Sequence, residues 1–302
     1  MAAKVLAVAP AALARHSLPS LLPVSRSALD ESIIGSKLVV EPLLANRSRS
    51  AEENRKWEIG DCVINALIAA EKLAQAAMTI ESAVHACNPM DQNKAACAGD
   101  VLGIYATFSA VAAYLSGVAS TCPVPVNVQA MCASDIADIN YGIGTLGSAL
   151  ATINMTCEPG ATEEREPIPE DRKSNAMGMC VINAAEAAAY IGHAVLSIRA
   201  SVHNCAQVAR DAREERDIRS TCSADISQVL QSFFLVMAYL SNAAALCGDT
   251  LIVGAACSNR VLSVLAGLSE IAAGASGAVG DCAKVPSMVV PFGNSNRDRG
   301  AR

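Results

Sequence analysis

The sequence predicts an all-α fold of six long helices, arranged as two homologous, disulfide-stapled three-helix bundles. Three observations carry this prediction: a constant spacing between cysteines, a helical repeat of apolar residues, and a similarity between the two halves of the chain. The composition agrees, because 52% of the 302 residues are hydrophobic whereas only 3% are aromatic. This balance favours helices that pack through small side chains over β-sandwiches, which need aromatic and β-branched strands.

The 12 cysteines form consecutive pairs whose two members are always 25 residues apart. These pairs are Cys62 and Cys87, Cys97 and Cys122, Cys132 and Cys157, Cys180 and Cys205, Cys222 and Cys247, and Cys257 and Cys282. The connectors between pairs vary in length, as expected when rigid elements are joined by loops. Each bracketed segment is therefore predicted to be a helix, about 37 Å long at 1.5 Å per residue.

Apolar residues recur within each bracket at alternating steps of four and three. From Cys132 these steps reach Ile136, Ile139, Ile143, Leu146, Leu150, Ile153 and Cys157. Such spacing is typical of helix bundles, so we expect a seam that points at neighbouring helices and not at solvent. Short polar side chains, suited to the first turn of a helix, lie three residues after five opening cysteines: Asn65, Asp100, Asp135, Asn183 and Asp225.

The two halves of the chain resemble each other. Residues 62–66 and 180–184 both read Cys-Val-Ile-Asn-Ala, and residues 113–116 and 238–241 both read Ala-Tyr-Leu-Ser. The repeat unit is therefore three helices. We expect a targeting or disordered leader (1–56), a first three-helix unit (57–157), a charged, proline-containing linker (158–179), a second unit (180–284) and a disordered tail (285–302).

Up–down helices bring the cysteines together at the ends of each unit, where hairpin partners are the natural disulfides. We expect Cys87–Cys97, Cys122–Cys132, Cys205–Cys222 and Cys247–Cys257. The pairs Cys157–Cys180 and Cys62–Cys282 would complete the set if the two units pack together, although sequence alone does not fix connectivity.

A zinc site is the alternative use of the cysteines, since His85 and His203 end equivalent helices and each lies near three cysteines, as in Cys₃His sites. The opposite helix ends have no histidine, and no C-x-x-C pair exists in the chain. Disulfides explain every cysteine with one rule, so we expect no metal and keep His85 and His203 as the candidate ligand residues.

Charged residues within the predicted helices argue against membrane spans, which rarely contain them. Glu71, Lys72, Glu186 and Arg199 are examples. We therefore expect a soluble bundle, in which the second and fifth helices are apolar enough to face lipid or a large partner. A net charge of -6 with no long basic run argues against nucleic acid as a partner. No nucleophile elbow, phosphate loop or dinucleotide fingerprint occurs, so we expect neither enzymatic activity nor a cofactor.

Cysteine-bracketed, alanine-rich helices with the phrases Cys132-Ala-Ser-Asp135-Ile136 and Cys222-Ser-Ala-Asp225-Ile226 resemble a largely uncharacterised group of dinoflagellate repeat proteins. The resemblance covers about residues 60–285. It implies an oxidising or plastid-linked compartment and a structural or assembly role, as an accessory subunit of a photosynthetic membrane complex. It supplies no catalytic residues.

Two hypotheses about function follow. In the first, the chain is a non-enzymatic structural or interaction protein whose partners are other protein subunits. In the second, it carries an apolar ligand or pigment between alanine-lined helices, with His85 or His203 as ligands. Both place it in an oxidising compartment, the plastid or thylakoid lumen or the secretory pathway, and not in the reducing cytosol.

Overall fold

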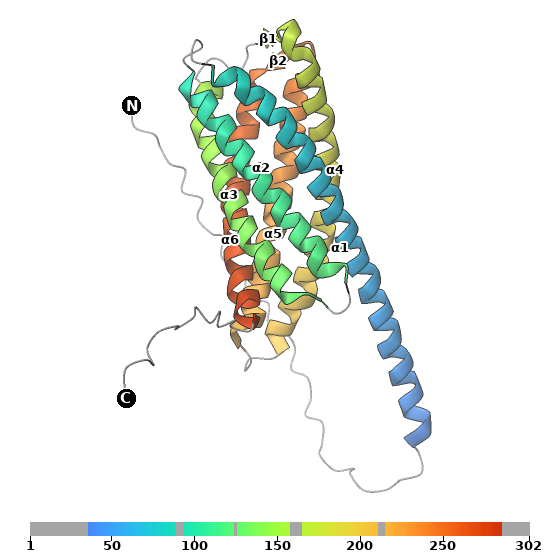
Figure 1. Cartoon of the computed structure of the whole chain (residues 1–302). Coiled ribbons are helices and arrows are strands. Elements are labelled where there is room, and N and C mark those ends of the chain that lie inside the picture. Colours follow the sequence, from blue (N-terminus) through green and yellow to red (C-terminus); the bar gives the residue numbers. More distant parts are fainter. Residues whose placement is uncertain (1–35, 89–92, 124–125, 158–164, 211–214, 286–302) are drawn as a thin grey trace, which may run out of the picture. The chain divides into compact units, whose positions relative to one another are not determined.

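Six α-helices dominate the computed structural model, which describes residues 36–88, 93–123, 126–157, 165–210 and 215–285. They are α1 (Ser36–Ala86), α2 (Lys94–Thr121), α3 (Val128–Thr156), α4 (Glu170–Arg210), α5 (Glu215–Leu246) and α6 (Val253–Asp281), followed by the short 3₁₀ turn η2 (Cys282–Lys284). Strands β1 (Arg165–Pro167) and β2 (Thr250–Ile252) pair antiparallel as a small ribbon. The all-α prediction with six long helices is confirmed (Figure 1).

The helices begin well before their opening cysteines. Asn93 caps α2 and Asn127 caps α3, each accepting backbone N–H bonds with its side chain. Helix α4 starts at Glu170, inside the predicted linker, and α1 starts at Ser36, inside the predicted leader. The expectation that helices start at the cysteines is therefore wrong, because capping asparagines lie in the preceding connectors. Residues 1–35 and 286–302 lie outside the described residues, with most of the leader and of the tail.

The chain divides into two compact units, Met1–Ser50 and Ala51–Arg302, and the helix bundle lies within the second. In that unit the helices form a closed ring in the order α1, α2, α3, α6, α5, α4. Neighbours run antiparallel: along α1 and α4, for example, Asn54 lies opposite Arg199 and Met78 lies opposite Asn175. Helices of both sequence repeats thus share one bundle instead of forming two separate ones.

All 12 cysteines are paired, and each bonded pair of helices is tied at both ends. The bonds are Cys62–Cys122 and Cys87–Cys97 between α1 and α2, Cys180–Cys247 and Cys205–Cys222 between α4 and α5, and Cys132–Cys282 and Cys157–Cys257 between α3 and α6. The predicted Cys87–Cys97 and Cys205–Cys222 bonds are confirmed.

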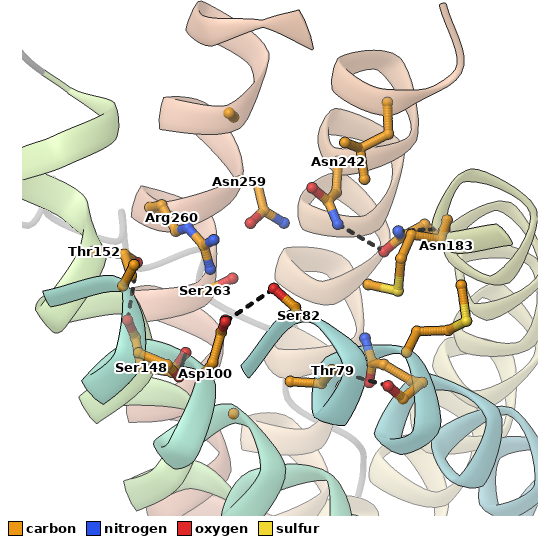
Figure 2. A pocket seen from close by; sticks show the side chains of 18 of the residues that line it. Thr79, Ser82, Asp100, Ser148, Thr152, Asn183, Asn242, Asn259, Arg260 and Ser263 are labelled. Atoms are coloured by element: carbon orange, nitrogen blue, oxygen red, sulfur yellow. Dashed lines mark hydrogen bonds between the residues drawn. The ribbon is translucent and has the colours of Figure 1, made fainter. Parts of the chain in front are cut away.

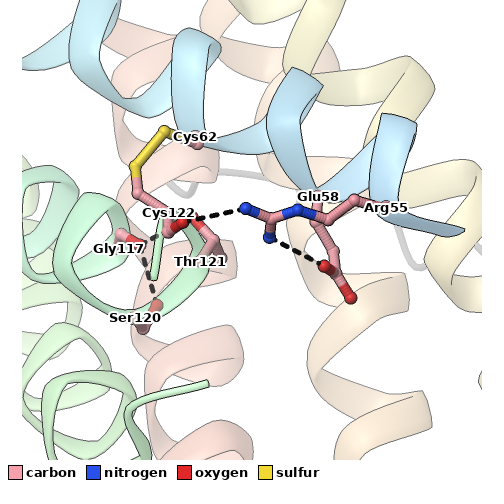
Figure 3. The surroundings of a disulfide bond; sticks show 7 residues. All are labelled: Arg55, Glu58, Cys62, Gly117, Ser120, Thr121 and Cys122. Atoms are coloured by element: carbon pink, nitrogen blue, oxygen red, sulfur yellow. Dashed lines mark hydrogen bonds and ion pairs between the residues drawn. A yellow bond between two sulfur atoms is a disulfide. The ribbon is translucent and has the colours of Figure 1, made fainter. Parts of the chain in front are cut away.

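Four predicted pairings are wrong: Cys122–Cys132, Cys247–Cys257, Cys157–Cys180 and Cys62–Cys282. The first two assume that each hairpin loop is closed by its own disulfide, and the other two join the cysteines left over. Instead Cys122 bonds Cys62 in the middle of α1, where Arg55 also donates a hydrogen bond to the Cys122 carbonyl (3.1 Å) and pairs with Glu58 (3.1 Å) (Figure 3). Helix α3 is left to bond with α6 of the other repeat.

The disulfide pattern is unchanged when the two halves of the chain are exchanged. The alignment of the repeats turns Cys62–Cys122 into Cys180–Cys247, and it turns Cys132–Cys282 into Cys257–Cys157. Buried hydrogen bonds repeat as well: Ser134 donates to the Ala113 carbonyl at 2.9 Å, and its equivalent Asn259 donates to the Ala238 carbonyl at 2.8 Å. Because equivalent helices such as α1 and α4 run in opposite directions, the halves are an inverted repeat about an axis across the bundle.

The crossing of α3 and α6 at this axis needs glycine. Gly142 and Gly267 are equivalent in the repeat and face each other, so that a Cβ on either would lie 2.8–2.9 Å from the carbonyl oxygen of the other. Any larger residue would push the two helices apart. Small residues at crossings are typical of helices that pack backbone to backbone.

The predicted apolar seam is only half correct. In α1, every second stop of the alternating pattern is buried, as expected: these are Ala69, Ala76 and Ala83. The intervening positions are about half exposed, as at Ile143 (51%) and Phe233 (49%). A step of four residues moves a side chain about 40° around the helix axis, whereas a step of seven moves it about 20° in the opposite direction. The buried stops and the stops between them therefore lie on different faces of the helix. The narrower face packs against neighbours and the other face points outward.

We call the outward apolar residues the outer belt, and they occur on all six helices. Its members are Val63, Leu67, Leu73, Ile80, Val101, Phe108, Leu115, Ile136, Ile143, Leu150, Val181, Ile191, Val195, Ile198, Ile226, Leu230, Phe233, Leu240, Val261, Leu265, Leu268 and Val279. Among the described residues between the bracketing cysteines, Glu81 is the only exposed Asp, Glu, Lys or Arg.

Five helical segments in the described part of the chain are long and apolar enough to cross a membrane, judged by length and composition. They are Asn54–Ala86, Lys94–Thr121, Arg172–Ala206, Arg219–Leu246 and Val253–Lys284. They belong to α1, α2, α4, α5 and α6. Helix α3 is not among them, although it contributes Ile136, Ile143 and Leu150 to the outer belt.

Candidate functional site

The centre of the bundle contains an ion pair. Lys72 of α1 and Glu186 of α4 are buried to 1% and 0% exposure, and their Nζ and Oε1 atoms lie 3.0 Å apart. Gln75 accepts a second hydrogen bond from Lys72 (3.0 Å) and donates one to Glu186 (3.4 Å). A buried charge is tolerated only when it is paired and hydrogen-bonded, so this pair fixes α1 against α4.

Three tyrosines surround the lysine. Lys72 donates a hydrogen bond to the Tyr239 hydroxyl, and its ammonium group lies 4.7 Å from the ring centre of Tyr239, 5.5 Å from that of Tyr141 and 5.7 Å from that of Tyr190. The Tyr190 ring stacks on Tyr239, and its hydroxyl lies 2.8 Å from that of a fourth tyrosine, Tyr114. Aromatic faces attract cations, so the three rings stabilise the buried lysine.

The inverted repeat explains the symmetry of this layer. Tyr114 and Tyr239 are equivalent, and so are Tyr190 and Lys72. The Tyr114–Tyr190 and Tyr239–Lys72 hydrogen bonds, which both join the two halves, are thus counterparts of each other. The centre is built twice, with a lysine replacing a tyrosine in one copy.

Further polar groups continue the layer on the side of α5 and α6. Gln231 hydrogen-bonds Glu270, which also bonds the carboxyl group of Asp138 on α3. His193 of α4, 8% exposed, lies 2.9 Å from the Ser232 hydroxyl through Nδ1.

A cavity of about 680 Å³ enters from the ribbon end of the bundle, where β1 and β2 lie. Its wall combines apolar side chains with polar groups: Asp100 accepts a hydrogen bond from Ser82 (2.9 Å), and Asn242 donates one to Asn183 (3.2 Å). Figure 2 shows Asp100 and Arg260 directed into this space from α2 and α6. Lys72, Tyr141 and Tyr239 line its inner end. We call it the ribbon-end cavity.

A second cavity, of about 490 Å³, enters from the opposite end, and we call it the far-end cavity. Tyr114 and His193 are among its lining residues. Its lining contains six carboxylates and one arginine: Glu58, Asp61, Asp135, Asp138, Asp225, Asp281 and Arg199. Arg199 lies over the Trp57 ring (4.5 Å) and donates to Asn54 (3.0 Å), so its charge is turned to the rim.

The two cavities are related by the inverted repeat. Asn183 in the first corresponds to Asn65 in the second, and Asp100 corresponds to Asp225. Their charges differ, because Arg260 of the ribbon-end cavity corresponds to Asp135 of the far-end cavity. Tyr190 and Glu186, both 0% exposed, line neither cavity and lie between them.

The residues proposed from sequence as ligands have modest surroundings. His85 is exposed at the rim of the ribbon-end cavity, and His203 is exposed beside Asn204 (3.3 Å) at the far end. The Cys₃His alternative is not supported, since the disulfides leave no thiolate to bind zinc. Within the described residues no group of three or more His, Cys, Asp or Glu is arranged to hold a metal ion.

Sequence reasoning missed most of the interior. Asn65, Asn183 and Asp225 are buried and do not cap helices. The equivalence of Asp100 with Asp225 and of Tyr114 with Tyr239 was a usable signal, because polar residues repeated within apolar helices have to face one another. The Lys72–Glu186 pair joins positions that the repeat does not relate, so no sequence pattern indicated it.

Comparison with known proteins adds nothing to these observations: no family model, curated protein or solved structure matches the chain.

Proposed function

We propose that the protein is a non-enzymatic structural membrane protein, a disulfide-stapled scaffold whose outer belt lies in lipid. The observation that carries the proposal is the reversal of the usual pattern of a soluble protein. Lys72, Glu186 and Glu270 are buried, while apolar side chains on all six helices point outward. Ionisable residues within membrane spans face the bundle interior and pair with one another, as these do.

The extent of the outer belt supports lipid as its occupant. A protein partner would cover one patch, but the belt surrounds the ring and includes members from every helix. At 1.5 Å per residue it extends about 26 Å along α1 (Val63 to Ile80) and about 27 Å along α6 (Val261 to Val279). With the reach of the side chains at each edge, this height matches the hydrocarbon core of a bilayer, about 30 Å.

The disulfides restrict which membrane is suitable. Their presence indicates an oxidising, non-cytosolic environment. Cys87–Cys97, Cys157–Cys257 and Cys180–Cys247 lie at the ribbon end, and the other three lie at the far end. A spanning bundle would expose disulfides near both faces, so we infer a membrane between two oxidising spaces. The plastid and a photosynthetic complex remain part of this proposal and rest on the dinoflagellate resemblance.

A role as a carrier is the second candidate, because two cavities enter the bundle. The alternative of an apolar ligand or pigment meets a mixed wall in the ribbon-end cavity, where apolar side chains surround Asp100, Asn183 and Arg260. A ligand of this cavity is therefore expected to combine apolar and polar groups.

Membrane extraction of the native, unreduced protein tests the main proposal. We expect it to resist alkaline carbonate, to require detergent for purification and to float with lipid vesicles. Mass spectrometry after alkylation should find no free thiol before reduction and 12 after it, since every cysteine is paired. A monodisperse protein in detergent-free buffer would contradict the proposal and would indicate that protein subunits cover the belt.

A further inference from the structure

We propose that the bundle interior is a path for small cations across the membrane, entered through the far-end cavity and closed at Tyr190. This inference rests on the membrane placement proposed above and goes beyond a structural role. It starts from the two cavities, which approach each other from opposite ends of the bundle and end on the two sides of one buried aromatic layer.

The barrier between the cavities is thin. Tyr239 lines the ribbon-end cavity and Tyr114 lines the far-end cavity. Tyr190 contacts both, stacking on the first at 5.5 Å between ring centres and hydrogen-bonding the second at 2.8 Å. Tyr190 and Glu186, both with 0% exposure, therefore separate two spaces that are open at their outer ends, and the Tyr190 ring is the one that contacts both tyrosines. A rotation of this ring away from Tyr114 would join them.

The inverted repeat gives a reason for this arrangement. In transporters built from two inverted halves, the substrate site lies near the middle of the membrane where the halves meet, and each half supplies one access route. Here the halves meet at the Tyr190–Lys72 layer, and each cavity is the repeat image of the other. The scaffold role alone requires neither cavity.

The charges select cations. Six acidic residues and one arginine line the far-end cavity. Two of the six are paired, Glu58 with Arg55 and Asp281 with Lys284, and the arginine is held by Asn54 and Trp57. Oδ2 of Asp135 has no hydrogen-bond partner in the described structure, and because burial raises the pKa of this carboxyl group to about 8, an entering cation binds there by displacing its proton. Lys72 does not reverse the sign of the path, because Glu186 neutralises it at 3.0 Å.

Flux into vesicles tests the proposal. The full-length, unreduced protein is reconstituted into liposomes that contain a Tl⁺-quenched dye, and flotation of each sample confirms insertion separately. We expect wild-type protein to admit Tl⁺ faster than empty liposomes do. Tyr190→Ala should raise the rate about tenfold by joining the cavities, since pore-lining constrictions set conduction. Ile191→Ala, at the next residue but in the outer belt, is the matched control and should leave it unchanged.

Two further variants serve as additional controls for the Tl⁺ flux assay. Tyr190→Phe keeps the ring and should retain the closed state, which covers a failure of the alanine variant to fold. Asp135→Asn preserves shape and should reduce Tl⁺ flux several-fold, because an amide cannot give up a proton to bind the cation as a carboxylate. If inserted Tyr190→Ala protein gives the same Tl⁺ flux as empty liposomes, the proposed path is wrong. Equal chloride and Tl⁺ fluxes would contradict its cation selectivity. Failure to float would instead contradict the membrane placement.

Discussion

The inner and outer faces of the same six helices have opposite chemistry. The inner face contains a lysine, several carboxylates and four tyrosines, whereas the outer face between the cysteines is almost free of charge. In a water-soluble bundle the inner face is the apolar one. The comparison supports the proposal that the surroundings of this protein are less polar than its own centre.

The largest effect should come from unpairing the central charge. Lys72→Ala leaves Glu186 buried without its partner, and the expected loss is about 3–5 kcal/mol of unfolding free energy. Lys56→Ala on the same helix removes an ion pair with Glu52 in which both side chains are about 70% exposed, and it should cost less than about 1 kcal/mol. Denaturant unfolding in detergent micelles measures both.

The double variant Lys72→Met/Glu186→Leu refines this result. It removes both charges at once, so much of the stability lost in Lys72→Ala should return. If Lys72→Ala and Lys56→Ala cost the same, the central pair is solvated and the contrast between the faces does not hold.

A charge placed in the outer belt should have the next largest effect. Phe233→Lys lies near the middle of α5, and in a bilayer it should make the free energy of membrane insertion less favourable by about 2.5–3.5 kcal/mol. Val84→Lys is even more exposed, 71% against 49%, but lies at the end of α1 near Glu81 and should be tolerated. A glycosylation-based insertion assay compares them. Equal tolerance of both lysines would mean that water surrounds the belt.

The smallest expected effect is the difference in stability between losing a hydrogen bond in the interior and losing one on the outer face of the same helix. Tyr114→Phe leaves the Tyr190 hydroxyl unpaired in the central layer, with an expected cost of about 1–2 kcal/mol. Tyr105→Phe removes the bond to Asn140 (2.9 Å) on the outer face and should cost about 0.5 kcal/mol. Thermal unfolding of the two variants gives the difference, and a larger cost at Tyr105 would contradict the dry interior.

The sequence allowed the helices to be predicted because a fixed spacing of 25 between cysteines is a local property of one helix. The partners of Cys122 and Cys132 depend on which helices become neighbours in the ring, and adjacency along the chain misled the prediction. The charged residues raise a different difficulty, because the sequence does not show their partners. Lys72 and Glu186 seemed to exclude membrane spans when each was considered alone, whereas in the structure they neutralise each other.

The disulfides also determine how the bundle can move. They occur only between α1 and α2, α3 and α6, and α4 and α5, so cross-linked interfaces alternate around the ring with free ones. Mechanically the protein is three two-helix plates, each fixed at both ends by disulfides and joined to the others by the connecting segments of the chain and by non-covalent contacts. The plates can tilt without breaking a disulfide, so the proposed path could open while the oxidised frame stays intact.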